Sequence, residues 1–155
     1  MIYKQYNCTD PNCGCSGPIA PCTSCTGTQN SASLVVTGSP PSGCPVISET
    51  LPWVAFTPQT QHCDYQWGGE GMSQYTLHML FCETNSTWWA ALFGPNDTVC
   101  FGSAGGALVT FCVTRNGNQL YWARQVNGVS CVGGQLTGSF TVPASSGGAV
   151  ATVTL

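Results

Sequence analysis

Cysteines are the residues of this 155-residue sequence with the clearest capacity for chemistry, and five of its eleven crowd into the first segment. These five are Cys8, Cys13, Cys15, Cys22 and Cys25. Tetrahedral zinc needs four soft or borderline ligands, and Cys22-Thr-Ser-Cys25 has the spacing of a zinc knuckle, whereas Cys13-Gly-Cys15 is too tight for one. We therefore interpret the cluster as disulfides, with zinc as the alternative and no cofactor expected.

Six further cysteines are spread through the rest of the chain: Cys44, Cys63, Cys82, Cys100, Cys112 and Cys131. All six are disulfide candidates, and we expect bridges between strands or sheets among the last five. An odd total leaves at least one thiol free, metal-bound or joined to another chain. Disulfides persist in oxidising compartments, so an extracellular or virion location is predicted. The start MIYKQYNCTD nevertheless shows no secretory signal, and a virion protein oxidised after lysis satisfies both observations.

Catalytic constellations are weak in this sequence. A nucleophile needs an adjacent base, and only His62 and His78 are available. His62 adjoins Cys63, but neighbours on a strand point to opposite faces, so the two do not form a dyad. No pair stands out among the carboxylates, which are Asp10, Glu49, Asp64, Glu70, Glu83 and Asp97. We predict no catalytic residue and no enzyme.

Two consecutive tryptophans, Trp88 and Trp89, are the candidate ligand or interface residues. On a strand they must face opposite sides of the sheet, so at most one belongs to a given core layer. An exposed indole could stack on a sugar or seal a protein interface. The alternative is that both faces of the strand are covered.

Charged residues make up only 6% of the chain, which excludes several classes of partner. The three basic residues, Lys4, Arg115 and Arg124, cannot neutralise a row of phosphates, so neither nucleic acid nor an anionic membrane is expected. No apolar run approaches the roughly 20 residues of a spanning helix. So little charge leaves little repulsion between copies, which favours self-association or packing against other structural subunits.

Composition divides the chain into a Cys-rich, loop-like arm over residues 1–32 and a β domain over residues 33–155. Apolar or alternating runs separated by Gly, Pro, Asn and Ser predict the strands of an antiparallel β-sandwich or jelly roll. They are Ser33–Thr37, Leu51–Thr57, Cys63–Trp67, Gln74–Cys82, Thr87–Phe93, Thr98–Phe101, Ala107–Arg115, Gln119–Val126, Val129–Val132, Leu136–Val142 and Ala149–Leu155.

Local signals add detail to this prediction. Asn116-Gly117 predicts a tight hairpin turn, and Asn127-Gly128 predicts a second turn that completes a three-stranded meander. Alternation within Gln74–Cys82 assigns one face to the core, with Leu80 as an exception. The expected core residues of that face are Tyr75, Leu77, Met79 and Phe81, and those elsewhere are Trp53, Trp67 and Trp122.

In its layout the sequence resembles Cys-rich β-sandwich structural proteins of tailed bacteriophages or prophages. Cys22-Thr-Ser-Cys25, the segment SLVVTG, Trp53, Cys63, the alternating segment that ends at Cys82 and the closing GGAVATVTL carry the resemblance. It implies a virion or tail-associated structural part and brings no catalytic motif. We therefore expect a non-enzymatic assembly protein, with a carbohydrate-binding module as the alternative.

Overall fold

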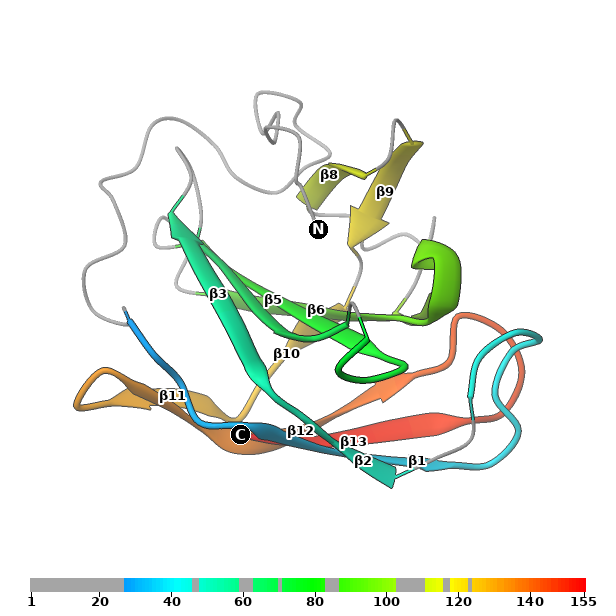
Figure 1. Cartoon of the computed structure of the whole chain (residues 1–155), viewed down its shortest axis with the longest axis horizontal. Helices are drawn as coiled ribbons and strands as arrows, with labels where there is room; N and C mark the ends of the chain where they lie inside the picture. The colour runs from blue at the N-terminus through cyan, green and yellow to red at the C-terminus, as the bar shows by residue number, and fades with distance from the viewer. Residues whose placement is uncertain are drawn as a thin grey trace.

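The computed structural model describes residues 27–45, 48–58, 63–69, 71–82, 87–102, 111–115, 118–122 and 124–155. Two antiparallel sheets pack face to face, so the predicted all-β sandwich is confirmed (Figure 1). Residues 1–26 of the predicted arm lie outside the described residues. The strands are β1 Ala32–Thr37, β2 Ser48–Leu51, β3 Trp53–Pro58, β4 Cys63–Gly68, β5 Thr76–Cys82, β6 Thr87–Phe93, β7 Val99–Phe101, β8 Phe111–Arg115, β9 Asn118–Trp122, β10 Arg124–Val126, β11 Val129–Val132, β12 Gln135–Pro143 and β13 Val150–Thr154.

Sheet A has five strands in the order β11-β12-β13-β1-β2, all of them antiparallel to their neighbours. Two of its three interior strands, β1 and β13, come from opposite ends of the described chain, with Ser33 of β1 opposite Thr154 of β13. Burial alternates strictly along β1, where Ala32, Leu34 and Val36 are buried and the residues between them are exposed. This alternation is expected of a strand with one face on the core and the other in solvent.

Sheet B has the order β10-β6-β5-β4-β3, and β7 pairs with β6 beside β10. Three residues that were predicted for the core on and before β5 are fully buried, namely Tyr75, Leu77 and Met79. The fourth, Phe81, is half-buried against the same core. The period-2 prediction for this segment is therefore confirmed.

The opposite face of sheet B is buried as well, whereas the outer face of sheet A is exposed. Leu80 and His78 have no exposed surface, and Trp89 and Phe93 on β6 are almost fully buried. The β8–β9 hairpin lies on this side of sheet B, away from sheet A, and β9 contacts β6 (Figure 1). Leu80 is apolar on the face that was predicted to be polar, because the strand is covered on both faces.

Two predicted strands are each split where the chain changes sheet. The segment predicted as Leu51–Thr57 is divided at Pro52 into the end of β2 in sheet A and β3 in sheet B. Proline lacks a backbone N–H and cannot continue a ladder on both sides. The segment predicted as Gln119–Val126 is likewise divided into β9 of the hairpin and β10 of sheet B.

The two Asn-Gly dipeptides have different outcomes. Strands β8 and β9 pair from Phe111 opposite Trp122 to Arg115 opposite Asn118, so the hairpin is confirmed, although Asn116 and Gly117 lie outside the described residues. The predicted three-stranded meander is wrong. After Asn127, Gly128 adopts φ 87°, and the chain passes from β10 in sheet B to β11, which pairs with β12 in sheet A.

Aromatic side chains fill much of the space between the sheets. Trp67 is fully buried, as predicted, and its Nε1 donates a hydrogen bond to the Asn30 carbonyl oxygen at 2.9 Å. Trp53 is partly buried against this core, with its ring centroid 5.1 Å from that of Trp67. The side chain of Trp122 lies outside the described part. The Trp67 indole is thus buried with its N–H group satisfied by a hydrogen bond.

Candidate functional site

One disulfide, between Cys44 and Cys100, is described in full. It joins the loop before β2 to β7, with an S–S distance of 2.08 Å and a Cα–Cα distance of 5.7 Å across 56 residues of sequence. Both cysteines are buried. Cys100 was expected to pair within the group from Cys63 onward, and its bond to Cys44 corrects that expectation, because the loop that carries Cys44 passes beside β7.

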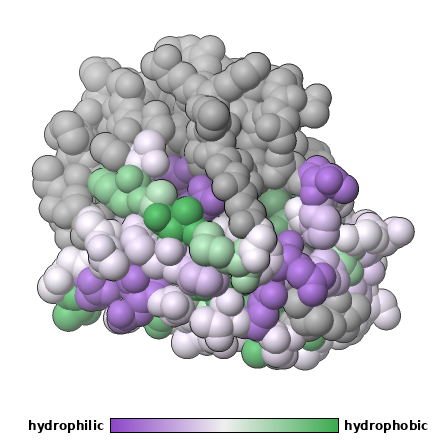
Figure 2. All heavy atoms as spheres, viewed as in Figure 1, coloured by the Kyte–Doolittle hydropathy of each residue, from purple (hydrophilic) through white to green (hydrophobic). Residues whose placement is uncertain are grey.

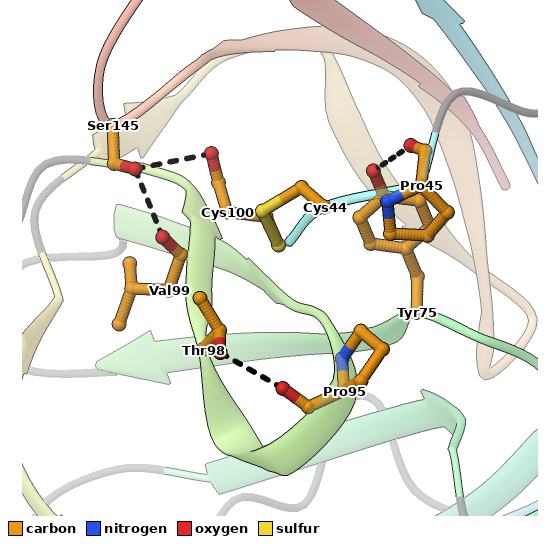
Figure 3. Close-up of a disulfide and its surroundings, with 8 residues drawn as sticks. All are labelled: Cys44, Pro45, Tyr75, Pro95, Thr98, Val99, Cys100 and Ser145. Carbon is orange, nitrogen blue, oxygen red and sulfur yellow. Dashed lines mark hydrogen bonds between the residues drawn. A yellow bond between two sulfur atoms is a disulfide. The ribbon is translucent and has the colours of Figure 1, made fainter. Parts of the chain in front are cut away.

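Hydrogen bonds gather around this disulfide and tie four segments together (Figure 3). The Ser145 hydroxyl donates to the Val99 carbonyl at 2.9 Å and to the Cys100 carbonyl at 3.2 Å. The Tyr75 hydroxyl donates to the carbonyl oxygen of Pro45, the residue after Cys44. The junction therefore connects sheet B to the β12–β13 loop of sheet A and has a structural role.

The remaining cysteines are described to different extents. Cys63, at the start of β4, and Cys131, on β11, are both disulfide-bonded. Cys82 ends β5 and Cys112 lies on β8, but their side chains are outside the described part. The arm cysteines that were interpreted as disulfides or zinc ligands, Cys8, Cys13, Cys15, Cys22 and Cys25, lie outside the described residues. In the described ranges no three His, Cys, Asp or Glu side chains gather as a metal site would need.

Trp88 and Trp89 face opposite sides of sheet B, but neither is exposed. Trp88 is 8% exposed in the core between the sheets, where its ring stacks on Phe81 with a centroid distance of 4.6 Å. Trp89 is 4% exposed on the other face. Of the two alternatives for this pair, the structure has the one in which both faces of the strand are covered, so neither indole forms an open platform. The pair thus contributes packing and offers no exposed ring for a sugar.

A buried polar pair, Asp64 and His78, was not anticipated from the sequence. These residues lie on β4 and β5 with 2% and 0% exposure, and His78 Nδ1 is 3.4 Å from Asp64 Oδ1. The carboxylate fixes the orientation of the imidazole, whose ring also meets Phe93 edge-on at 5.6 Å. Both residues occur on the face that alternation marks as polar, but only the register between β4 and β5 brings them together. His62 lies outside the described residues.

Tyr75 combines burial with a nearby carboxylate. Its backbone N–H donates to Glu49 Oε1 at 3.0 Å, and its side chain is fully buried. Burial, reinforced by the negative charge of Glu49, raises the pKa of the Tyr75 phenol to about 12. The hydroxyl therefore stays protonated and donates to Pro45 across the physiological range.

The outer face of sheet A is an extended uncharged surface, and we call it the neutral face. Alternate residues of five neighbouring strands point to it, and none of their side chains carries a charge. They are Ser48 and Thr50 of β2, Ser33, Val35 and Thr37 of β1, Val150, Thr152 and Thr154 of β13, Gln135, Thr137, Ser139, Thr141 and Pro143 of β12, and Ser130 and Val132 of β11.

Register places these side chains in rows across the strands. One row runs from Thr50 through Ser33 and Thr154 to Ser139, and the hydroxyl oxygens of Ser139 and Thr154 are 3.4 Å apart. Glu49, the charged residue of β2, alternates to the other side of the strand. Figure 2 views the sandwich from the side, where pale residues are mixed with hydrophilic purple and hydrophobic green ones.

Valines add an apolar component to the neutral face. Val35, Val132 and Val150 are 41%, 67% and 37% exposed, although valine is usually buried. Val35 lies opposite Thr152, and Val150 is two residues from that partner, so the two valines are diagonal neighbours across β1 and β13. The alternation of serine and threonine with apolar residues in β1 and β13 was the sequence signal that could have indicated this surface.

No family model, no curated protein and no solved structure matches the chain. Within the ranges that the structure describes, no helix has the length and apolar character needed to cross a membrane.

Proposed function

We propose that this chain is a non-enzymatic structural subunit that associates with further copies of itself through the neutral face. The observation that carries the proposal is the absence of charged side chains on the outward face of five adjacent strands, combined with exposed valines on that face. Protein interfaces are depleted of charged residues at their core, and this surface has that composition before any partner is added.

Chemistry favours a second copy as the partner. Hydroxyl groups both donate and accept hydrogen bonds, so a surface rich in serine and threonine is complementary to itself. A two-fold axis would bring the same patch of each copy together, and sheets stack readily in this way when no charge must be desolvated. The net charge of −3 is small for 155 residues and opposes association only weakly.

We place this assembly in an oxidising setting, either a virion or the extracellular space. Support comes from the eleven cysteines and from the buried disulfide between Cys44 and Cys100. The resemblance to structural proteins of tailed bacteriophages agrees with this proposal. No catalytic step is assigned to the chain.

Sedimentation velocity over a concentration series, without reductant, tests the proposal. The parent protein is expected to form dimers or larger species, and Val35→Lys is expected to shift them towards monomer, because each contact would then bury an unpaired ammonium group. Val54→Lys is the matched control, since Val54 is also a half-exposed valine but lies on β3 of sheet B.

Further variants and measurements make the outcome of this experiment decisive. A second variant, Thr152→Lys, probes the same row of side chains if Val35→Lys impairs folding. Non-reducing gels of the same samples report any covalent link between chains. A parent protein that stays monomeric at every concentration, or equal effects of the Val35 and Val54 variants, would contradict the proposal.

A further inference from the structure

A groove opens at the side of the sandwich where the chain crosses from sheet B to sheet A. It has a volume of about 400 Å³ and lies between the end of β10 and the second half of β12. Strand β11 pairs with β12 only as far as Gly138, so the flank of β12 beyond that residue faces β10 instead. A volume of this size falls in the range of small-ligand sites.

Polar side chains form both rims of the groove, and apolar side chains form its floor. Gln125 and Asn127 lie on one rim, and Ser139 and Thr141 lie on the other. The floor consists of Val126 and Phe140, each 6% exposed.

No residue of the lining carries a charge. In the part of the chain that the structure describes, the side chains of Gln125, Asn127 and Thr141 make no hydrogen bond. Their donors and acceptors are therefore available to a ligand.

We infer that this groove binds a neutral saccharide. Two amides and two hydroxyls match a ligand with alternating donors and acceptors, and the carbon-bound hydrogens of a sugar ring suit the apolar floor. Among its lining residues the groove offers no basic group to a phosphate or carboxylate and no carboxylate to a cation. Hydrogen-bonding groups on both rims favour a sugar ring, which has hydroxyls on each side. An extended peptide would instead rely on its backbone for hydrogen bonds.

Ser139 and Thr141 belong both to the neutral face and to the rim of the groove, so self-association through that face competes with saccharide binding. Val35 is not part of the groove lining, so the Val35→Lys variant, which is expected to be monomeric, should bind saccharide at least as tightly as the parent. The absence of saccharide binding in the groove can thus be distinguished from the absence of self-association through the neutral face.

The test uses the 155-residue chain and an array of neutral and acidic oligosaccharides, followed by titration calorimetry with the neutral oligosaccharide that binds most tightly. Gln125→Ala combined with Asn127→Ala is expected to weaken binding about tenfold, because two hydrogen bonds are lost. Both residues are exposed, so the fold is expected to be kept, and circular dichroism of the double variant checks this. Asn30→Ala removes an exposed amide elsewhere and is expected to leave affinity unchanged.

Binding of neutral probes that is weakened by the double variant and not by Asn30→Ala supports the inference. It is overturned if the parent binds no neutral saccharide, if only acidic glycans bind, or if the double variant binds as tightly as the parent. It would also be overturned if a spin-labelled neutral peptide, and not a sugar, bound in the groove.

Discussion

Cys44 and Cys100 are 56 residues apart in the sequence, yet their Cα atoms lie 5.7 Å apart at the junction of both sheets. Ser145 and Tyr75 add hydrogen bonds to the backbone on either side of this bond. Four segments that are distant in sequence thus converge on one covalent link.

Removal of this disulfide is expected to destabilise the fold. Replacing both Cys44 and Cys100 by serine should lower the free energy of unfolding by about 4 kcal/mol, as loop-closure entropy predicts for a loop of this length. Urea titration without reductant measures the change and leaves the other disulfides intact. An unchanged midpoint would show that the surrounding hydrogen bonds hold the junction without the bond.

Alkaline pH is expected to weaken the junction through Tyr75. Its pKa rises from about 10 in the unfolded chain to about 12 in the fold, so the folded state retains its proton longer. The contribution of this group is complete below pH 10 and is lost as the pH rises towards 12. Thermal unfolding followed from pH 8 to pH 12 should show a smaller alkaline loss for Tyr75→Phe than for the parent.

The same variant has a second expected effect. At neutral pH, Tyr75→Phe should cost about 1 kcal/mol, because the Pro45 carbonyl loses its donor. Equal alkaline losses in parent and variant would rule out the assignment to Tyr75, since the other ionisable groups are shared.

The Asp64–His78 pair is expected to couple β4 to β5. Asp64→Asn and His78→Gln should each destabilise the protein by about 1–3 kcal/mol, because each leaves a buried polar partner poorly satisfied. A double-mutant cycle should give a coupling energy of about 0.5 kcal/mol or more. Simple additivity of the two single variants would mean that the contact contributes nothing.

Gly138 is expected to tolerate no side chain. Its φ is 134°, and a Cβ at this position would lie 1.9 Å from the carbonyl oxygen of Gly128, which is backbone and cannot move cheaply. Gly138→Ala should therefore destabilise the protein by at least about 2 kcal/mol more than Gly133→Ala. Gly133 is the matched control, because it has a positive φ of 58° but no atom within 4 Å of its Cβ position. Similar melting temperatures for the two variants would contradict this packing.

Local patterns in the sequence determined where most of the strands of this protein lie. Thr87–Phe93 and Val129–Val132 were predicted with the bounds that the structure has, because β-branched and aromatic residues between turn-forming residues suffice to specify an extended segment. The core face of β5 followed from the same period of two.

Only the tertiary structure decided how these strands meet. The bond between Cys44 and Cys100, the contact of Asp64 with His78 and the burial of both Trp88 and Trp89 all depend on register or on a second layer, which no local preference specifies. The neutral face has the same origin. Its hydroxyl residues were visible as separate alternations, but they form one surface because β1 and β13 pair across the length of the chain.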